Sequence, residues 1–533
     1  MKSPSQNEGA FSINAGRSFR QSLFAMMGIS SVVVMVAIDQ TVVGTALPTI
    51  VAELKGFQYY AWVATAYLLT SVITVPVFGR LGDWFGRKPF VVAAIVLFTG
   101  ASALCGLAGS MFELVAFRAL QGIGGGMLVG TAFASIPDLF PDPVRRLRWQ
   151  VLFSSAFGLA NAIGPSLGGL LTQHYGWRFV FLVNLPVGLV GLYFTARHLP
   201  HIRHLQAGRF SLDWIGAALI AATLGSMQLL VESMASEGLS RKNLVLAAVM
   251  LISGALLVRQ ERRAAQPIVP PALVRNRAVA TLWVLSILMG MAMFSLLFYV
   301  PLLLQGGMEM LPDAAGFFVT PLVFCIAVGT VTNTQIVTRL KNPNVLLYVG
   351  FSMLACACGG VALVNSMHDK AMLIASMFAG GVGIGFIMPN LTVFAQQVAG
   401  KLQLGIATAL IQSARMVGGM IGMAIVGTIV HVKYMRGIVD LLGTQANAPW
   451  AVAVLNPQLL VSQAQTVRFL QTTADAGIAG GKVVTAARLL LISAVNDAEM
   501  AVTALMLIAL VGVWLLPLIR LSTHQDVALS APE

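Results

Sequence analysis

Residues 37–48 read AIDQTVVGTALP and place a carboxylate, Asp39, inside an apolar run from about Gln21 to Leu47. A charged side chain near the centre of a membrane helix costs roughly 3 kcal/mol. Such residues usually face a polar cavity, pair with another group and carry function. Asp39 therefore predicts a second buried charge elsewhere in the chain.

The composition is that of a polytopic membrane protein. Of the 533 residues, 57% are hydrophobic and only 10% are charged, whereas roughly a quarter are charged in soluble domains. Apolar windows of about 20 residues, enough to cross the hydrocarbon core of a bilayer, recur along the chain. They predict fourteen membrane helices and no separate catalytic domain, with helices near 22–47, 58–79, 89–109, 112–135, 148–171, 177–196, 212–231, 242–258, 277–304, 312–337, 343–365, 371–396, 404–431 and 499–520.

The basic residues indicate how these helices are oriented. In the short loops, 21 Lys and Arg residues fall on the side of the N-terminus and five on the other side. The positive-inside rule then places both termini in the cytoplasm. The formal net charge of +13 therefore comes mainly from basic residues that orient the helices in the membrane. For this reason we expect no nucleic-acid partner.

The four cysteines show no pattern for a metal site or a disulfide framework. Each falls inside an apolar segment, at Cys105, Cys325, Cys356 and Cys358. We interpret them as small apolar packing residues and expect no metal site.

Arg118, in the stretch RALQGIGGG, is a second charge inside an apolar run. Asp39 lies eight residues below the outer end of the first helix, about 12 Å at 1.5 Å per residue, and Arg118 lies eight residues below the same surface on the fourth. We therefore expect the two charges to pair. The pair could be purely structural, or it could bind and release a proton as the surroundings of Asp39 change.

Two glycine-rich stretches accompany this pair. The first, GRLGDWFGRK at 79–88, predicts a short cytoplasmic turn in which glycines allow close approach and Asp83 meets a helix end or Arg87. We interpret it as a gate made of Gly79, Gly82, Asp83, Gly86, Arg87 and Lys88. The second, GLANAIGPSLGG at 158–169, predicts tight helix packing and a broken backbone hydrogen bond at Pro165.

Together these stretches resemble motifs of the major facilitator superfamily. AIDQTVVGTALP and WRFVFLVNLP (177–186) are similar to signatures of its fourteen-helix drug:proton antiporter branch, the EmrB/QacA type. The resemblance implies an all-α major facilitator fold with two six-helix bundles and two inserted helices. It implies a proton-coupling role for Asp39 and Arg118, an inner gate at the Asp83 loop, and an antiporter motif in the fifth helix formed by Gly158, Asn161, Gly164, Pro165, Gly168 and Gly169.

The expected domain order follows from this fold. It comprises a cytoplasmic tail over 1–21, a first bundle over 22–197 and an inserted pair with its cytoplasmic loops over 198–276. A second bundle covers 277–520, including an outer loop at 432–498, and a cytoplasmic tail covers 521–533. The outer loop could be a helical cap on the membrane surface or a docking site for a periplasmic adaptor protein.

A substrate site is expected near the membrane midplane between the bundles. We expect it to be lined by apolar or aromatic side chains together with a few polar groups. The candidate lining residues are Gln40, Trp62, Tyr67, Gln121, Met293, Phe294, Phe298, Tyr299, Gln305, Asn390 and Arg415. For each of them, ordinary packing is the alternative. The helix expected at 312–337 has no carboxylate in its apolar part. Some members of the family that it resembles handle divalent cations and have an extra carboxylate in the second bundle, so this difference favours monocationic, neutral or amphipathic substrates over dications.

The hypothesis is a multidrug exporter in the cytoplasmic (inner) membrane that exchanges hydrophobic or amphipathic compounds for protons. The proton gradient would supply the energy, with no cofactor, and no phosphate-binding GxxxxGK[ST] motif is present. Two alternatives stay open: a dedicated exporter of one endogenous metabolite, lipid or siderophore, and a non-transporting receptor or scaffold. An enzyme is not expected, because no cluster of nucleophile, base and acid is visible.

Overall fold

The computed structural model describes residues 19–139, 149, 160–161, 163–200, 213–237, 240–264, 267–268, 275–337, 339–365, 369–399, 404–448, 450–475 and 478–517. All regular structure in these residues is helical. Helices suit this apolar chain because each satisfies its own backbone hydrogen bonds, which lipid cannot do.

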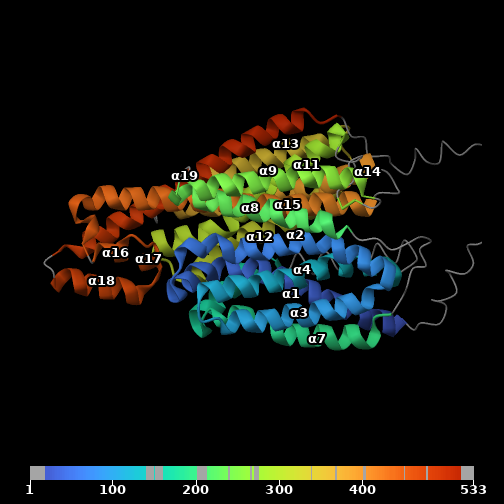
Figure 1. Cartoon of the computed structure of the whole chain (residues 1–533), viewed down its shortest axis with the longest axis horizontal. Helices are drawn as coiled ribbons and strands as arrows, with labels where there is room; N and C mark the ends of the chain where they lie inside the picture. The colour runs from blue at the N-terminus through green and yellow to red at the C-terminus, as the bar shows by residue number, and fades with distance from the viewer. Residues whose placement is uncertain are drawn as a thin grey trace, which may run out of the picture.

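The first bundle contains the N-terminal helices, drawn in blue to teal in Figure 1. They are α1 (Phe19–Leu54), α2 (Tyr60–Phe85), α3 (Arg87–Leu107), α4 (Met111–Leu139), a helical segment at 163–175, α6 (Arg178–Leu182) and α7 (Asn184–His198). A short 3-10 turn, η2 (Phe57–Tyr59), joins α1 to α2.

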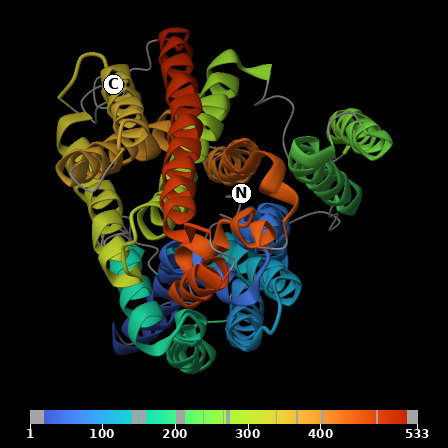
Figure 2. The same cartoon turned by 90° about the vertical axis from the view of Figure 1, so that its left-hand side faces the viewer.

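The inserted pair consists of α8 (Trp214–Glu237) and α9 (Arg241–Arg263). Ser240 caps α9, because its side chain accepts a hydrogen bond from the backbone N–H of Asn243. Figure 2 shows these two green helices standing at the side of the two bundles.

The second bundle contains α11 (Arg277–Leu302), α12 (Pro312–Val337), α13 (Asn344–Ala362), α14 (Lys370–Ala399), α15 (Leu404–Leu442) and α19 (Gly480–Trp514). A π-helical turn, η3 (Leu303–Gly307), continues α11. The described helices thus form the expected all-α fold of two bundles and an inserted pair (Figures 1 and 2).

Thirteen helices in the described residues are long and apolar enough to cross a membrane. The expected fifth helix, 148–171, falls mostly outside those residues, and its described part lies in the segment at 163–175. The protein is therefore a multi-pass membrane protein.

The stretch at 432–498 is not a loop, and the expected start of the last helix at 499 is wrong. α15 continues to Leu442, and η6 (Gly443–Asn447), α16 (Ala451–Val454), α17 (Gln458–Val461) and α18 (Gln463–Asp475) lead to α19, which begins at Gly480. Hydropathy located only the apolar part of α19, whereas the helix also contains charged residues. These elements project at the left of Figure 1, at the end opposite the start of α1 and the end of α19.

We call this projecting end the distal end, and the end where α1 begins and α19 stops the terminal end. Hydrogen bonds join the two bundles near the distal end. Gln305 donates from Nε2 to the carbonyl of Thr45 over 2.7 Å and accepts at Oε1 from Thr49 over 3.0 Å. Tyr60 donates to the carbonyl of Phe298 over 2.7 Å. The bundles are therefore closed on each other at the distal end.

Candidate functional site

A buried ion pair lies inside the first bundle. Arg118 on α4 donates from Nη1 to Oδ2 of Asp39 on α1 over 2.7 Å. Asp39 is 0% exposed and Arg118 is 1% exposed. Two charges removed this far from water are stable only when further polar groups surround them.

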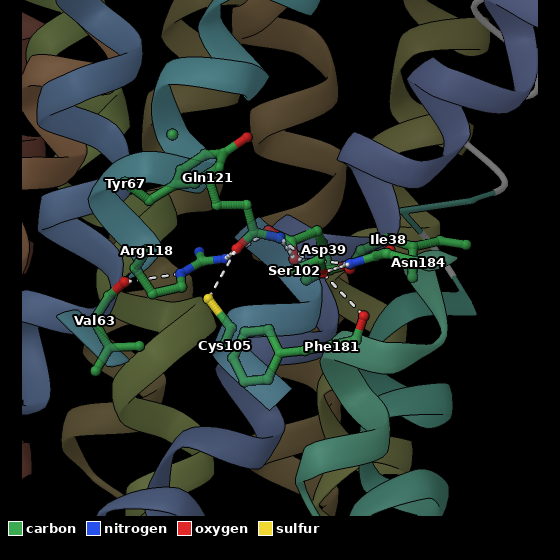
Figure 3. Close-up of polar contacts among 12 residues, drawn as sticks. Ile38, Asp39, Val63, Tyr67, Ser102, Cys105, Arg118, Gln121, Phe181 and Asn184 are labelled. Atoms are coloured by element: carbon green, nitrogen blue, oxygen red, sulfur yellow. Dashed lines mark hydrogen bonds and ion pairs between the residues drawn. The ribbon is translucent and has the colours of Figure 1, made fainter. Parts of the chain in front are cut away.

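Amide side chains on α4 and α7 complete the surroundings of the carboxylate (Figure 3). Gln121, one turn after Arg118 on α4, donates to Asp39 Oδ1 over 2.8 Å, and Asn184 at the start of α7 donates to the same oxygen over 3.1 Å. Gln121 also accepts from Arg118 over 2.7 Å. Both carboxylate oxygens therefore accept hydrogen bonds, from three separate side chains.

Ser102 on α3 connects the two amides. Its Oγ accepts from Gln121 over 3.1 Å and from Asn184 over 2.9 Å, and it donates to the carbonyl of Phe181 over 2.9 Å. The thiol of Cys105, one turn further along α3, donates to Gln121 over 3.7 Å. The polar network around Asp39 thus links α1 to α3, α4 and α7.

The guanidinium of Arg118 has partners on α2 as well. Its Nε donates to the carbonyl of Val63 over 3.1 Å, and its Cζ lies 4.6 Å from the centre of the Tyr67 ring. The Phe181 ring lies on another side, 5.9 Å away. Aromatic faces stabilise a desolvated cation, so the arginine has partners in several directions.

This arrangement gives Asp39 two distinct bonding states. A carboxylate only accepts hydrogen bonds, and the three side chains around it donate N–H groups. Protonation of Asp39 removes the negative charge that these donors face, so its charge-assisted hydrogen bonds weaken and Arg118 loses its counter-ion. Gain of a proton would therefore weaken contacts that hold four helices together.

Sequence reasoning found the two charges but missed part of their surroundings. Ser102, Cys105 and Asn184 were not proposed as site residues, and Gln121 was assigned to the substrate cavity although it bonds to the ion pair. Asn184 lies in WRFVFLVNLP, where an amide within an apolar stretch was an available signal.

The glycine-rich stretch at 79–88 is a helix junction and not an open turn. α2 continues to Phe85, and only Gly86, with a φ of +88°, separates it from α3. This φ is in the region that glycine adopts without strain. A Cβ on Gly82 would lie 3.2 Å from the Arg87 side chain and 3.4 Å from that of Thr131, so α2 passes close to α4 here.

The other residues assigned to the gate lie at the same junction. Gly79 approaches the carbonyl of Gly130 on α4, and Arg87 and Lys88 are half-buried at the start of α3. Asp83 lies in α2, and its side chain is outside the described part of the structure.

The fifth-helix motif packs against both bundles. A Cβ on Gly164 would meet Thr41 of α1, and a Cβ on Gly168 would meet Val42 and Thr45. The carbonyl of Pro165 accepts a hydrogen bond from Thr45 over 3.2 Å. These small residues, four apart, allow the segment at 163–175 to approach α1 closely.

The same segment touches α12 of the second bundle. A Cβ on Gly169 would meet the backbone of Pro312 and Asp313, and Ser166 and Thr320 share a hydrogen bond of 2.5 Å. Asn161 is half-buried, and Gly158 lies outside the described residues.

Comparison with known proteins decides the family. The model of the Major Facilitator Superfamily matches residues 29–423. The chain belongs to this superfamily. It is 34% identical over 411 residues to multidrug transporter protein MdtP of Bacillus subtilis (strain 168), covering 76% of this chain and 75% of that protein.

Two other proteins resemble the chain. The tetracenomycin C resistance and export protein of Streptomyces glaucescens is 31% identical over 414 residues, covering 76% of this chain and 75% of that protein. A bacterial homologue of the human lysosomal transporter Spinster, solved in an inward-facing, unoccupied conformation, matches the fold with a TM-score of 0.65 and 16% identity. That match covers 94% of this chain and 98% of the solved one. The protein is therefore a membrane transporter of the superfamily.

In this protein, the residues that the sequence predicted to line the substrate cavity lie in several different places. Trp62 and Tyr299 line a cavity of ≈ 470 Å³ at the distal end between α2, α8 and α15. Tyr67 packs on Arg118, and Gln305 joins the bundles. The remaining predicted residues are spread over both bundles.

Five of these remaining residues, including Arg415, lie within the second bundle. Phe294 and Phe298 stack with ring centres 6.2 Å apart, and both are buried. Asn390 on α14 donates to Asn333 on α12 over 2.7 Å. Met293 is half-buried on α11, and Gln40, in the first bundle, is half-buried beside Asp39.

Arg415 has no carboxylate partner among the described residues. Its Nη1 lies 3.1 Å from the sulfur of Met388, a weak acceptor, and its Nε has no hydrogen-bond partner in the described part of the chain. Its side chain is half-buried on α15, next to α14.

Glu499 is a buried acid that sequence reasoning missed. It is 0% exposed on α19, and its Oε1 accepts a hydrogen bond of 2.5 Å from Ser295 on α11. The Cys358 thiol of α13 lies beside the carboxyl group, and Oε2 has no hydrogen-bond partner among the described residues. The expected last helix began at 499, which put this residue at a helix end; because α19 begins at Gly480, Glu499 lies in mid-helix.

Proposed function

We propose that this transporter exports hydrophobic or amphipathic compounds in exchange for protons, and that Asp39 carries the coupled proton. The observation that supports this most is the sealed ion pair of Asp39 and Arg118, 0% and 1% exposed, with Gln121 and Asn184 on the same carboxylate. An acid in the interior of a membrane protein can couple a proton to a change of shape only if its bonding differs between the two protonation states. Asp39 meets this requirement.

In the proposed cycle, the terminal end faces the cytoplasm. The distal contacts of Gln305 with Thr45 and Thr49, and of Tyr60 with Phe298, then close the outer side, and substrate enters from the cytoplasm. Opening of the distal end breaks these contacts and gives Asp39 access to protons from outside. Protonation of Asp39 weakens its bonds to Arg118, Gln121 and Asn184, and the return to the inward-facing state releases the proton.

The names of the relatives support the proposal that this protein transports small molecules out of the cell. One is called a multidrug transporter and another a resistance and export protein for a single compound. The second name keeps a dedicated exporter as the other candidate. The breadth of the substrate panel separates the two.

The experiment is transport in proteoliposomes under an imposed pH gradient. The panel contains a fluorescent lipophilic cation and several unrelated neutral amphiphiles, tested with wild type, Asp39→Asn and the exposed-site control Asp440→Asn. The proposal expects wild type and Asp440→Asn to accumulate several panel members and Asp39→Asn to accumulate none against a gradient. Accumulation of a single compound would support the dedicated exporter. Equal uphill accumulation by Asp39→Asn would contradict the role of Asp39.

A further inference from the structure

A cavity of ≈ 470 Å³ lies where the inserted helices meet both bundles. The first bundle contributes η2, the start of α2 and the start of α4; the second bundle contributes α15 and Tyr299; and α8 and α9 contribute Gln228, Leu229 and Lys242. Thr428 on α15 donates to the carbonyl of Val231 on α8 over 3.3 Å, so the inserted pair is joined to the second bundle beside the cavity. The inserted helices therefore form one wall of the cavity.

Aromatic side chains dominate the lining. They are Phe57, Tyr59, Tyr60, Trp62, Phe112 and Tyr299. The described lining residues include no carboxylate. Cavities of this size with aromatic walls and a few polar groups are typical of sites for drug-sized molecules. The walls favour a planar, uncharged ligand over a cation that needs an acidic counter-ion.

Two polar groups in the wall lack partners. Gln228 is 2% exposed, and its Oε1 has no hydrogen-bond partner among the described residues. His431 on α15 also lines the cavity, and its Nδ1 has no hydrogen-bond partner among the described residues either. A buried amide oxygen without a partner costs about 1–3 kcal/mol, and such groups usually have one. A ligand with an N–H or O–H group would supply the missing donor once the Gln228 amide turns toward it.

The cavity also borders the distal contact between the bundles. Tyr60 and Tyr299 both line it, their ring centres lie 5.4 Å apart, and Tyr60 donates to the carbonyl of Phe298. Tyr299 donates in turn to the carbonyl of Met423 on α15 over 3.0 Å. A ligand in the cavity therefore lies directly against the contacts that must separate when the distal end opens.

We propose that this cavity is an exit site for planar, uncharged aromatic compounds that carry a hydrogen-bond donor, with Gln228 as the acceptor and α8 and α9 as its side wall. The proposal rests on the export function proposed above, because the exit role requires substrate to leave at the distal end. It gives the inserted helices a role in substrate release.

The test is equilibrium binding of N-phenyl-1-naphthylamine, a neutral aromatic amine with one N–H donor, to the full chain in nanodiscs without a pH gradient. Gln228→Leu keeps the size of the side chain and removes the acceptor, and His431→Phe removes the second polar group. Gln173→Leu and His174→Phe make the same changes at exposed positions. Empty nanodiscs give the contribution of lipid.

The proposal expects saturable binding above the lipid background. We expect it to weaken about fivefold in Gln228→Leu, as for one lost hydrogen bond, and to be unchanged in both controls. Leu229→Trp, which narrows the cavity from α8, should remove the saturable component even if Gln228→Leu folds poorly. Binding to lipid only, or equal affinity in wild type, Gln228→Leu and Leu229→Trp, would overturn the proposal.

These outcomes are separate from those of the export experiment. If binding follows the expected pattern but wild type accumulates nothing under a pH gradient, the proposed export function fails and the cavity remains a ligand site without an exit role. If wild type exports the panel while binding is insensitive to the cavity variants, the exit site fails and the export function stands.

Discussion

Asp39 and Asn184 lie 145 residues apart in the chain, and Nδ2 of the asparagine donates to Oδ1 of the aspartate over 3.1 Å. The same Nδ2 donates to Ser102 over 2.9 Å. One amide therefore stabilises the carboxylate and joins α7 to α1 and α3. This contact belongs to the polar network that surrounds the ion pair.

Substitution of Asn184 by Leu should destabilise the first bundle. It removes both hydrogen bonds and leaves a buried charge with one donor fewer, a loss of about 1.5–3 kcal/mol for a bond to a charged group. Thermal unfolding in detergent, followed by tryptophan fluorescence, measures the effect, with the exposed Gln173→Leu as control. An unchanged melting temperature would mean that the amide contributes little to the network.

Small residues in the fifth-helix segment should tolerate no added methyl group. A Cβ on Gly168 would meet the backbone of Val42 and the side chain of Thr45, so Gly168→Ala should cost about 1–3 kcal/mol of stability through overpacking. Gly225→Ala is the matched control, because no atom lies within 4 Å of the added Cβ and alanine favours a helix by about 1 kcal/mol. The two variants should therefore shift the unfolding temperature in opposite directions. A stabilised Gly168→Ala would contradict the close packing of this segment on α1.

Gln305→Leu should shift the transporter away from the distally closed state. It removes the hydrogen bonds to Thr45 and from Thr49, together worth about 2 kcal/mol, or roughly a thirtyfold change in the ratio of closed to open states. The closed state should lose population in the variant relative to wild type.

Distances between spin labels at the distal ends of the two bundles measure this shift. Phe112 and Leu311 are suitable positions, with 73% and 43% of their surface exposed. The background is Cys356→Ala, because Cys356 is exposed and the other three cysteines are buried. A longer distance should gain population in Gln305→Leu, while identical distance distributions would show that these bonds do not control closure.

Glu499→Gln should fold at least as stably as wild type. The glutamine can accept the hydrogen bond from Ser295, and it removes the desolvation cost of an acid that has no cationic partner among the described residues. Free energies of unfolding at neutral pH, compared with Glu499→Leu, test this expectation. Glu499→Leu should be less stable than Glu499→Gln, because it leaves Ser295 without its acceptor. Strong destabilisation by Glu499→Gln alone would point to a charge partner outside the described residues.

The fold was predictable from sequence because its signal is local. Apolar windows and basic loops depend on residues next to each other in the chain, and α12 has the bounds that hydropathy predicted. Prediction failed where a helix continues beyond the apolar part. In α19, hydropathy places the start near Glu499, although Lys482 and Arg488 belong to the same helix.

The site was only partly predictable for a different reason. Depth along a helix sufficed to match Asp39 with Arg118, since both lie eight residues from one surface. Depth does not give the direction in which a side chain points. Gln121 was therefore placed in a cavity although it faces the ion pair, and Ser102 was not proposed at all.

If Asp39 carries the exchanged proton, its removal should separate proton movement from substrate movement, and this can be tested by measuring both together. Proteoliposomes containing a trapped pH-sensitive dye receive a gradient of a fluorescent substrate and no pH gradient. Wild type should move protons against the substrate flow. Asp39→Asn should still let substrate move down its gradient and should move no protons. Proton movement in Asp39→Asn at the wild-type ratio to substrate would contradict the account and assign the coupling to another group.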